Sequence, residues 1–151
     1  WKKSIEVNIN GTFFVTREII KHCVTKKKPC SIVLVGSTYS TVSSNHNLYL
    51  HDGKLHNKPV DYVATKSIIP NFTKYLATNY AKDNIRVNCL ILHGIEDNQP
   101  DWFKNNFKKL SPIQRLCKIT EVDGAFLFLA SDLSSYTTGT TLKVDGGWTA
   151  W

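Results

Sequence analysis

Two short apolar runs limit the fold of this chain more than any other feature of its sequence. Residues 31–36 read Ser-Ile-Val-Leu-Val-Gly, and residues 85–92 read Ile-Arg-Val-Asn-Cys-Leu-Ile-Leu. Runs so short and so rich in β-branched residues predict strands that are buried on both faces, as in a parallel sheet. Between them, residues 60–81 carry an apolar stripe that predicts a long helix. Strand, helix and strand together predict a right-handed βαβ unit, and hence an α/β fold.

The rest of the chain predicts three more helices and a third strand. The helices are expected at residues 4–25, at residues 101–110 and from a capping box at residues 120–123 to Ala130, and the strand at residues 140–145. Open α/β sheets bind their ligands at the carboxyl ends of their strands. The loops that follow the strands are therefore the expected location of a site.

Two features of the sequence fit no regular pattern. Residues 38–59 are polar and aperiodic, and a loop of this length in a compact domain is usually functional or disordered. Its histidines, His46, His51 and His56, could contact a ligand or could be ordinary exposed side chains. Pro70 lies inside the predicted long helix, where a proline costs roughly 3 kcal/mol unless a kink is required. The pattern offers no account of that proline.

The composition argues against several classes of partner. The net charge is +7, but the lysines are dispersed except at residues 26–28, and no zinc-finger, RNP-like or helix-turn-helix pattern occurs, so we expect no nucleic-acid partner. No apolar run has the length that a bilayer crossing needs, so we expect no membrane partner. The four cysteines form no Cys-x-x-Cys pair and have no histidine cluster beside them. We therefore expect free thiols, no metal site and a cytoplasmic location.

One pair on the predicted long helix has the chemistry of a proton donor. Tyr62 and Lys66 are four residues apart and should share one helix face. A neighbouring cation lowers the pKa of a phenol, which then exchanges a proton more readily near neutral pH. Such a pair suits reduction of a carbonyl or oxidation of an alcohol. Because this spacing also arises by chance, a plain surface Tyr–Lys pair is the alternative.

The surroundings of this pair carry a family resemblance. Ser37 ends the first strand, the Tyr62-x-x-x-Lys66 helix follows, and the last strand ends in Asp-Gly-Gly. With the segments at residues 7–13, 85–88, 128–132 and 144–147, this order resembles the C-terminal part of the short-chain dehydrogenases/reductases. The resemblance covers residues 1–151 and implies a Rossmann-like parallel sheet with flanking helices. The chain would be the catalytic and substrate-binding part of that domain, without the N-terminal dinucleotide-binding strands.

The resemblance implies roles for four side chains. Tyr62 would be the general acid/base, and Lys66 would lower the pKa of that phenol and hydrogen-bond the nicotinamide ribose. Ser37 would hold the substrate oxygen, and Asn8 would hold a water in the proton relay. A strand-end serine and a helix-start asparagine without catalytic roles are the alternatives, and Ser40, Ser43 and Asn10 compete for the same roles.

The resemblance implies NAD or NADP as the cofactor. The choice between the two stays open, because the segment that selects between them is not in this chain. Cofactor contacts are expected from Tyr62 and Lys66 and from Leu92, His93 and Ile95, which follow the second strand. The family usually has Pro-Gly where this chain has Leu92-His93, and Ile95 matches a residue whose backbone contacts the nicotinamide carboxamide. Without the Gly-rich turn of the family, the isolated chain is expected to bind dinucleotide poorly and to be inactive.

The implied activity is hydride transfer between NAD(P) and a carbonyl or alcohol carbon. The long interval from Ser37 to Tyr62, with residues 97–100, resembles a subgroup of flagellin-modification and surface-sugar biosynthesis dehydrogenases, which implies a sugar or sugar phosphate as substrate. Family members commonly form homodimers or homotetramers through the two long helices. The alternative is a non-catalytic relative, a binding or oligomerisation module, which Leu92-His93 and Pro70 favour.

Overall fold

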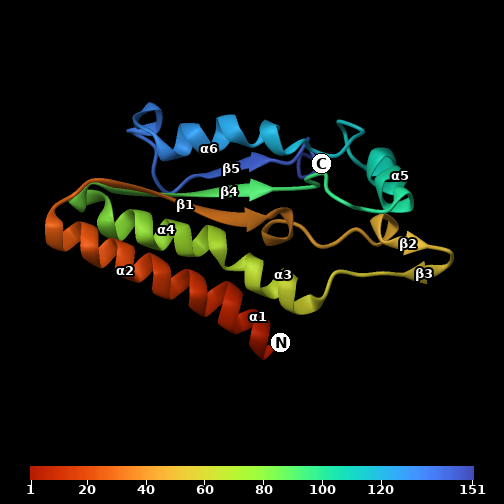
Figure 1. Cartoon of the computed structure of the whole chain (residues 1–151), viewed down its shortest axis with the longest axis horizontal. Helices are drawn as coiled ribbons and strands as arrows, with labels where there is room; N and C mark the ends of the chain where they lie inside the picture. The colour runs from red at the N-terminus through yellow and green to blue at the C-terminus, as the bar shows by residue number, and fades with distance from the viewer.

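Three parallel strands in the order β1-β4-β5 form the centre of the molecule (Figure 1). The computed structural model describes all 151 residues, with β1 at Cys30–Ser37, β4 at Ile85–Leu92 and β5 at Thr141–Val144. β1 pairs with β4 along its whole length, from Cys30 opposite Ile85 to Ser37 opposite Leu92. β4 is the central strand, and most of its side chains are fully buried. The predicted α/β fold with a parallel sheet is confirmed.

Helices cover both faces of this sheet (Figure 1). α2 (Gly11–Lys26) and α4 (Ile69–Tyr80) lie on one face, and α6 (Asp123–Ala130) lies on the other. Alternate residues of β4 point to opposite faces, so Val87, Cys89 and Ile91 join the core under α2 and α4. Leu90 joins the core under α6. All four cysteines are unpaired. None of the helices is both long and apolar enough for a membrane crossing.

The helix predicted at residues 4–25 is not one regular α-helix. It consists of α1 (Lys2–Ser4), a π-helical segment at Ile5–Asn10, and α2. In the wider segment the backbone N–H of Gly11 donates to the carbonyl of Glu6, five residues earlier. The hydroxyl of Thr12 donates to the Asn8 carbonyl at 2.8 Å.

The helix predicted at residues 60–81 is two helices, and Pro70 explains the division. α3 (Val60–Ser67) ends before Ile68, and α4 begins at Ile69. Pro70 therefore lies in the first turn of α4, where a backbone N–H has no partner within a helix and its loss costs little. The prediction of a single helix was wrong, because the start of a second helix satisfies the proline.

The polar stretch at residues 38–59 is folded. It contains a hairpin of β2 (Leu50–His51) and β3 (Lys54–Leu55), which turns through Asp52 and Gly53, both with positive φ. The stretch packs against α5 (Asp101–Leu110), which begins and ends where the sequence predicted. The amide of Asn106 on α5 donates to the Leu50 carbonyl at 2.9 Å and to the Leu48 carbonyl at 3.4 Å.

The capping box before α6 lies two residues earlier than predicted. The Glu121 carboxylate accepts the Lys118 backbone N–H at 2.8 Å, which opens a 3₁₀ turn at Ile119–Glu121. The side chain of Thr120, the predicted cap, makes no hydrogen bond there. Arg115 helps to hold Glu121 in this position, because its two terminal nitrogens each donate to the Glu121 carboxylate at 2.6 Å.

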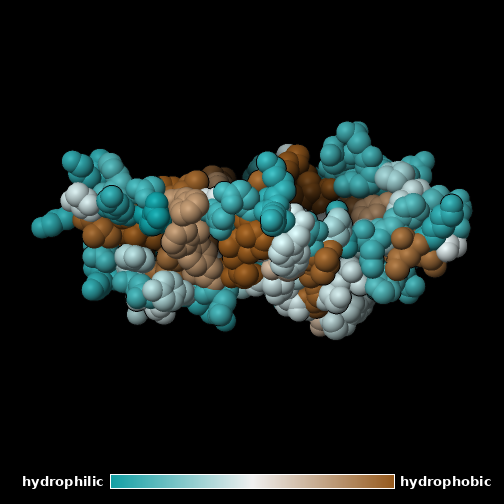
Figure 2. All heavy atoms as spheres, turned by 90° about the horizontal axis from the view of Figure 1, so that it is seen from below, coloured by the Kyte–Doolittle hydropathy of each residue, from teal (hydrophilic) through white to brown (hydrophobic).

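Apolar side chains gather on the outer face of the helical layer. Figure 2 shows them along the middle of the face that α2 and α4 form. They include large side chains that are between 42% and 63% exposed, namely Phe13, Phe14, Val15, Ile19 and Tyr75. Phe13 on α2 also contacts Phe72 on α4, with ring centroids 6.3 Å apart. A cluster of exposed large apolar side chains of this kind is typical of a face that packs against another molecule.

Candidate active site

A cavity of about 320 Å³ opens where β1 and β4 end. Six of the seven residues that the sequence singled out line it: Ser37, Tyr62, Lys66, Leu92, His93 and Ile95. Ser37 and Leu92 are the last residues of their strands and lie opposite each other in the register. The parallel pairing therefore brings together residues that are far apart in the chain. The seventh residue, Asn8, does not line the cavity.

The first turns of α3 bring Tyr62 and Lys66 to the cavity. The Lys66 ammonium donates a hydrogen bond to the Val35 carbonyl of β1 at 3.1 Å. Partial burial of this amine lowers the pKa of Lys66. The Tyr62 ring meets the Tyr39 ring edge-on at 6.4 Å, and the Lys58 ammonium lies 5.6 Å from the centre of the Tyr62 ring. β1 thus holds the side chain of Lys66, and Tyr39 and Lys58 lie against the ring of Tyr62.

Ser37 is the serine that reaches the cavity. It is buried, and its oxygen accepts the Tyr39 backbone N–H at 3.3 Å. Its hydroxyl hydrogen has no acceptor in the chain, so it is free to donate to a ligand. The competing Ser40 donates to the Ser37 carbonyl instead, and neither Ser40 nor Ser43 lines the cavity.

Asn8 supports α3 through Thr65. Its amide nitrogen donates to the hydroxyl of Thr65 at 3.0 Å, and that hydroxyl donates to the Tyr62 carbonyl at 3.1 Å. Thr65 is fully buried and lies between Tyr62 and Lys66 on α3. The competing Asn10 bonds only to the exposed Glu6. The water-holding role of Asn8 stays a prediction, but the contact with α3 distinguishes it from Asn10.

His93 occupies the position where the family usually has glycine, and its ring is wedged among aromatic side chains. Its Nδ1 lies 2.7 Å from the Thr38 hydroxyl, and its ring contacts Trp148 at 4.3 Å and Phe107 at 5.2 Å between centroids. Its Nε2 is buried without a hydrogen-bond partner. Burial lowers the pKa of His93 to about 4, so the ring is neutral at neutral pH.

This buried histidine predicts a stability loss in mild acid. The pKa is about 4 in the fold and about 6.5 in the unfolded chain, so the unfolded state binds more protons between these values. Stability should fall by about 2 to 3 kcal/mol as the pH falls from about 7 to about 4.5. The His93→Gln variant should lack this part of the pH dependence in urea unfolding. An equal pH dependence in both proteins would contradict the prediction.

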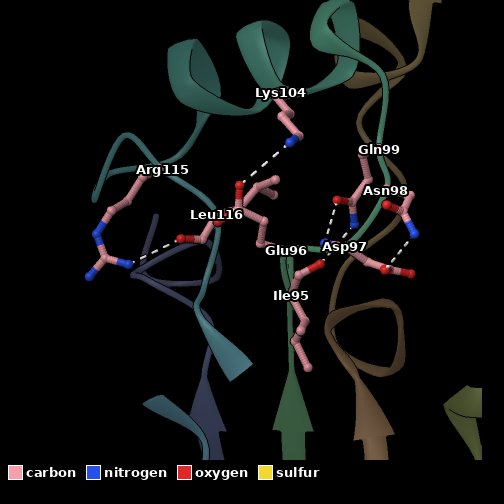
Figure 3. A network of polar contacts seen from close by, with 8 residues as sticks. All are labelled: Ile95, Glu96, Asp97, Asn98, Gln99, Lys104, Arg115 and Leu116. Atoms are coloured by element: carbon pink, nitrogen blue, oxygen red, sulfur yellow. Dashed lines mark hydrogen bonds and ion pairs between the residues drawn. The ribbon is translucent and has the colours of Figure 1, made fainter. Parts of the chain in front are cut away.

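The side chain of Gln99 stabilises the loop that follows β4 (Figure 3). The Gln99 side chain accepts the Asp97 backbone N–H at 2.8 Å and donates to the Ile95 carbonyl at 2.7 Å. Lys104 on α5 pairs with Glu96 at 3.5 Å. The Ile95 N–H donates to no group in the chain, so the backbone at Ile95 keeps a free donor at the edge of the cavity.

Several residues of the cavity were missed by the sequence reasoning. They are Tyr39, Tyr49, Lys58, Gln99 and Phe103. Their proximity depends on how residues 38–59 fold onto α5, which no local pattern reveals. The loop histidines do not line the cavity: His51 stacks on Trp102 of α5 at 4.8 Å, and His56 packs beside the same ring at 5.6 Å. No cluster of three or more His, Cys, Asp or Glu side chains is arranged to hold a metal ion.

Comparison with known sequences identifies relatives along the whole chain. A family model described as enoyl-(acyl carrier protein) reductase matches residues 1–149. The 3-oxoacyl-[acyl-carrier-protein] reductase FabG of Chlamydia pneumoniae is 35% identical over 153 residues, which cover 99% of this chain and 56% of the relative. The 3beta-hydroxysteroid dehydrogenase 1 of Eggerthella lenta is 31% identical, over 99% of this chain and 55% of the relative. The chain thus spans about half the length of the curated relatives it matches.

Solved structures agree with these sequence relatives. A short-chain dehydrogenase from Leptospira borgpetersenii with bound NAD+ superposes with a TM-score of 0.88 and 36% identity, over 96% of this chain and 54% of that one. A gluconate 5-dehydrogenase from Burkholderia cenocepacia, in complex with NADP and tartrate, gives a TM-score of 0.82 and 26% identity, over 97% and 55% of the two chains. By sequence, fold and the residues gathered at its cavity, the chain belongs to the short-chain dehydrogenase/reductase family.

Proposed function

We propose that this chain is the catalytic and substrate-binding part of an NAD(P)-dependent oxidoreductase. The enzyme would transfer hydride between nicotinamide and a carbonyl or alcohol carbon of a sugar or sugar phosphate. The convergence of Ser37, Tyr62 and Lys66 on one cavity at the carboxyl edge of the sheet carries the proposal. Ser37 ends β1, whereas Tyr62 and Lys66 lie on α3, and the first and last of the three are 29 positions apart in the sequence. The fold brings their side chains to one surface.

Each of these groups has a role in the proposed reaction. The Ser37 hydroxyl, free to donate, holds the substrate oxygen and stabilises the charge that develops on it. Tyr62 gives a proton to that oxygen during reduction and takes it back during oxidation. Lys66 supplies positive charge beside the phenol. Asn8 fixes α3 through Thr65 and, as the family resemblance implies, takes part in a water relay.

The cavity fits the nicotinamide half of the cofactor. When bound, NAD(P)H supplies the hydride. Lys66 and Tyr62 would contact the nicotinamide ribose, and the free Ile95 N–H would hold the carboxamide, with Leu92 and His93 beside the ring. Either NAD or NADP fits this half, because the two differ at the adenosine ribose. The solved relatives described above hold NAD+ and NADP.

The lining of the cavity favours a hydroxylated substrate. Three phenols, a serine and a glutamine line it, together with two lysines and no carboxylate. Among the relatives are a sorbose reductase of Candida albicans, at 29% identity, and the gluconate 5-dehydrogenase. The narrower resemblance to flagellin-modification dehydrogenases has no counterpart among the relatives described here. The proposed substrate class is therefore the broader one of sugar-like carbonyl compounds.

Turnover assays test the proposal. They use the longest natural form of the protein or, if that form lacks a dinucleotide-binding segment, a fusion of this chain to that segment of a relative; we call either one the assay form. Oxidation of NADH and NADPH is followed with ketoses, aldoses and their phosphates. Turnover of a sugar-like ketone supports the function. Cofactor binding without turnover of any substrate would favour the non-catalytic alternative, which His93 at a usual glycine position supports.

Lys58 predicts a preference for phosphorylated substrates. Its ammonium lies over the Tyr62 ring, lines the cavity and makes no ion pair. In the Lys58→Met variant, KM for a sugar phosphate should rise by about 2- to 5-fold, because an exposed ion pair is lost, while KM for the unphosphorylated sugar stays constant. Lys82→Met, at an exposed lysine far from the cavity lining, is the control. Equal changes for both sugars would contradict the prediction.

The outer face of α2 and α4 suits a homodimer or homotetramer, which we propose as the assembled state. Its exposed aromatic side chains, including Phe14 and Tyr75, would be covered by the same face of another copy. The unpaired cysteines suit a reducing compartment, and we propose the cytoplasm.

A further inference from the structure

Two buried phenols form a pair in the wall of the cavity. Tyr39 lies in the 3₁₀ turn Thr38–Ser40, just after β1, and Tyr49 follows the turn His46–Leu48. Their side chains are only 5% and 6% exposed, and their hydroxyl groups are hydrogen-bonded to each other. Both residues line the cavity that contains Tyr62. The pair is thus buried in the protein but adjacent to the proposed reaction centre.

The two phenol hydroxyls carry two protons, but only one of these protons takes part in a hydrogen bond within the chain. Each phenol carries a single O–H, and one of these protons is shared between the two oxygens. The second proton has no acceptor in the chain, since neither hydroxyl makes any other hydrogen bond. A buried donor without an acceptor is costly, because its interaction with water has been lost. A ligand oxygen in the cavity would satisfy this donor.

The pair also remains a proton donor at neutral pH. Burial raises the pKa of both phenols, and the neighbouring Tyr62 acts in the same direction on each. Both rings are therefore neutral. A neutral phenol donates to hydroxyl, carbonyl or phosphate oxygens without the desolvation cost of a buried charge.

The pair lies close to both groups that would hold the reacting oxygen. The backbone N–H of Tyr39 donates to the Ser37 hydroxyl oxygen at 3.3 Å, and the Tyr39 ring contacts the Tyr62 ring. A substrate oxygen between Ser37 and Tyr62 would therefore lie at the same end of the cavity as the phenol pair, with the part of the substrate next to the reacting carbon nearest to the pair.

We propose that the Tyr39–Tyr49 pair recognises an oxygen on the carbon next to the reacting carbonyl, so that the enzyme selects α-hydroxy ketones and aldehydes. This inference rests on the proposed function and narrows it from sugar-like carbonyls in general to those with a hydroxyl at the neighbouring position. In the reverse direction the selected substrate is a 1,2-diol. Such a contact makes the pair a specificity determinant, separate from the proton transfer at Tyr62.

Acetone and hydroxyacetone test this proposal, because they differ only by the hydroxyl next to the carbonyl. The wild-type assay form should reduce hydroxyacetone with the higher kcat/KM. The ratio of the two kcat/KM values should fall by about 3- to 10-fold in Tyr49→Phe or in Tyr39→Phe, whichever removes the phenol that donates to the substrate, since a neutral hydrogen bond is lost. Hydroxyacetone is intrinsically the more reactive ketone, but this difference cancels when variant and wild-type ratios are compared. Tyr136→Phe, at a fully exposed phenol, should leave the ratio unchanged.

The outcomes of this test separate the inference from the proposed function. A reduced ratio with acetone turnover retained supports the phenol pair. A purely structural pair would lower kcat/KM for both ketones equally and leave the ratio constant in both variants, which would overturn the inference alone. Absence of turnover of sugars and of both ketones by the wild-type assay form would overturn the proposed function as well. Thermal unfolding of each variant shows whether an equal loss comes from impaired folding.

Discussion

Replacing Tyr62 with phenylalanine should lower kcat by roughly 100- to 10,000-fold, the range over which a general acid or base contributes. The change removes only the hydroxyl, and the ring contact with Tyr39 and the packing of α3 are retained. Dinucleotide affinity should therefore stay within a few-fold of wild type. Steady-state reduction of the best sugar substrate by the assay form, with cofactor affinity from fluorescence titration, measures both quantities.

The control for this variant is Tyr136→Phe, which removes the same atom from a fully exposed ring. Its kcat should equal that of the wild type. If Tyr62→Phe also retained wild-type turnover, Tyr62 would not be the proton donor, and the proposed mechanism would fail. A joint loss of turnover and of cofactor binding would instead mean that the contact of the phenol with the ribose carries much of the cofactor affinity.

Replacing Gly94 with alanine should destabilise the fold by roughly 2 to 4 kcal/mol, the sum of overpacking and an unfavourable left-handed backbone. Gly94 has φ of 59°, and a Cβ there would lie 2.2 Å from Cζ and 2.5 Å from Cε2 of Phe107. Phe107 cannot move freely, because it stacks on Trp148 and His93. Urea unfolding of the assay form gives the free-energy difference.

Gly53→Ala provides a matched control for Gly94→Ala. Gly53 has a similar φ of 70°, but a Cβ added there would meet no atom within 4 Å. Its substitution should therefore show the backbone cost alone, about 1 kcal/mol. Equal losses of stability in the two variants would mean that the Phe107 ring relocates at no cost. The predicted rigidity of the aromatic cluster behind the cavity would then be wrong.

The sheet was predictable because its signals are local. The β4 run at residues 85–92 begins and ends where the apolar pattern does, since every second position must fill a core on one face or the other. The α5 boundaries at residues 101–110 follow in the same way from one amphipathic stripe. By contrast, the break at Ile68 and the π-helical segment depend on how helices meet their neighbours. The capping box differs from the prediction because Glu121, rather than Asp123, closes it while also binding Arg115.

The site was predictable only in part, for a related reason. Ser37, Tyr62 and Lys66 sit at the ends or first turns of regular elements, so the pattern that predicts those elements also positions these side chains. Tyr39 lies just two residues after Ser37, yet its partner Tyr49 comes from a loop whose path has no periodicity. The role of Gln99 was likewise not predictable, because it depends on a hydrogen bond from its side chain back to the Ile95 carbonyl.

The contact between the hairpin segment and α5 has a consequence for the shape of the cavity. Leu48 and Tyr49 from one segment, and Phe103 and Phe107 from the other, line the same cavity. Asn106 and the Trp102–His51 stack join the two segments to each other. Two segments joined in this way form one connected wall of the cavity, so a substitution that loosens α5 should also displace the hairpin.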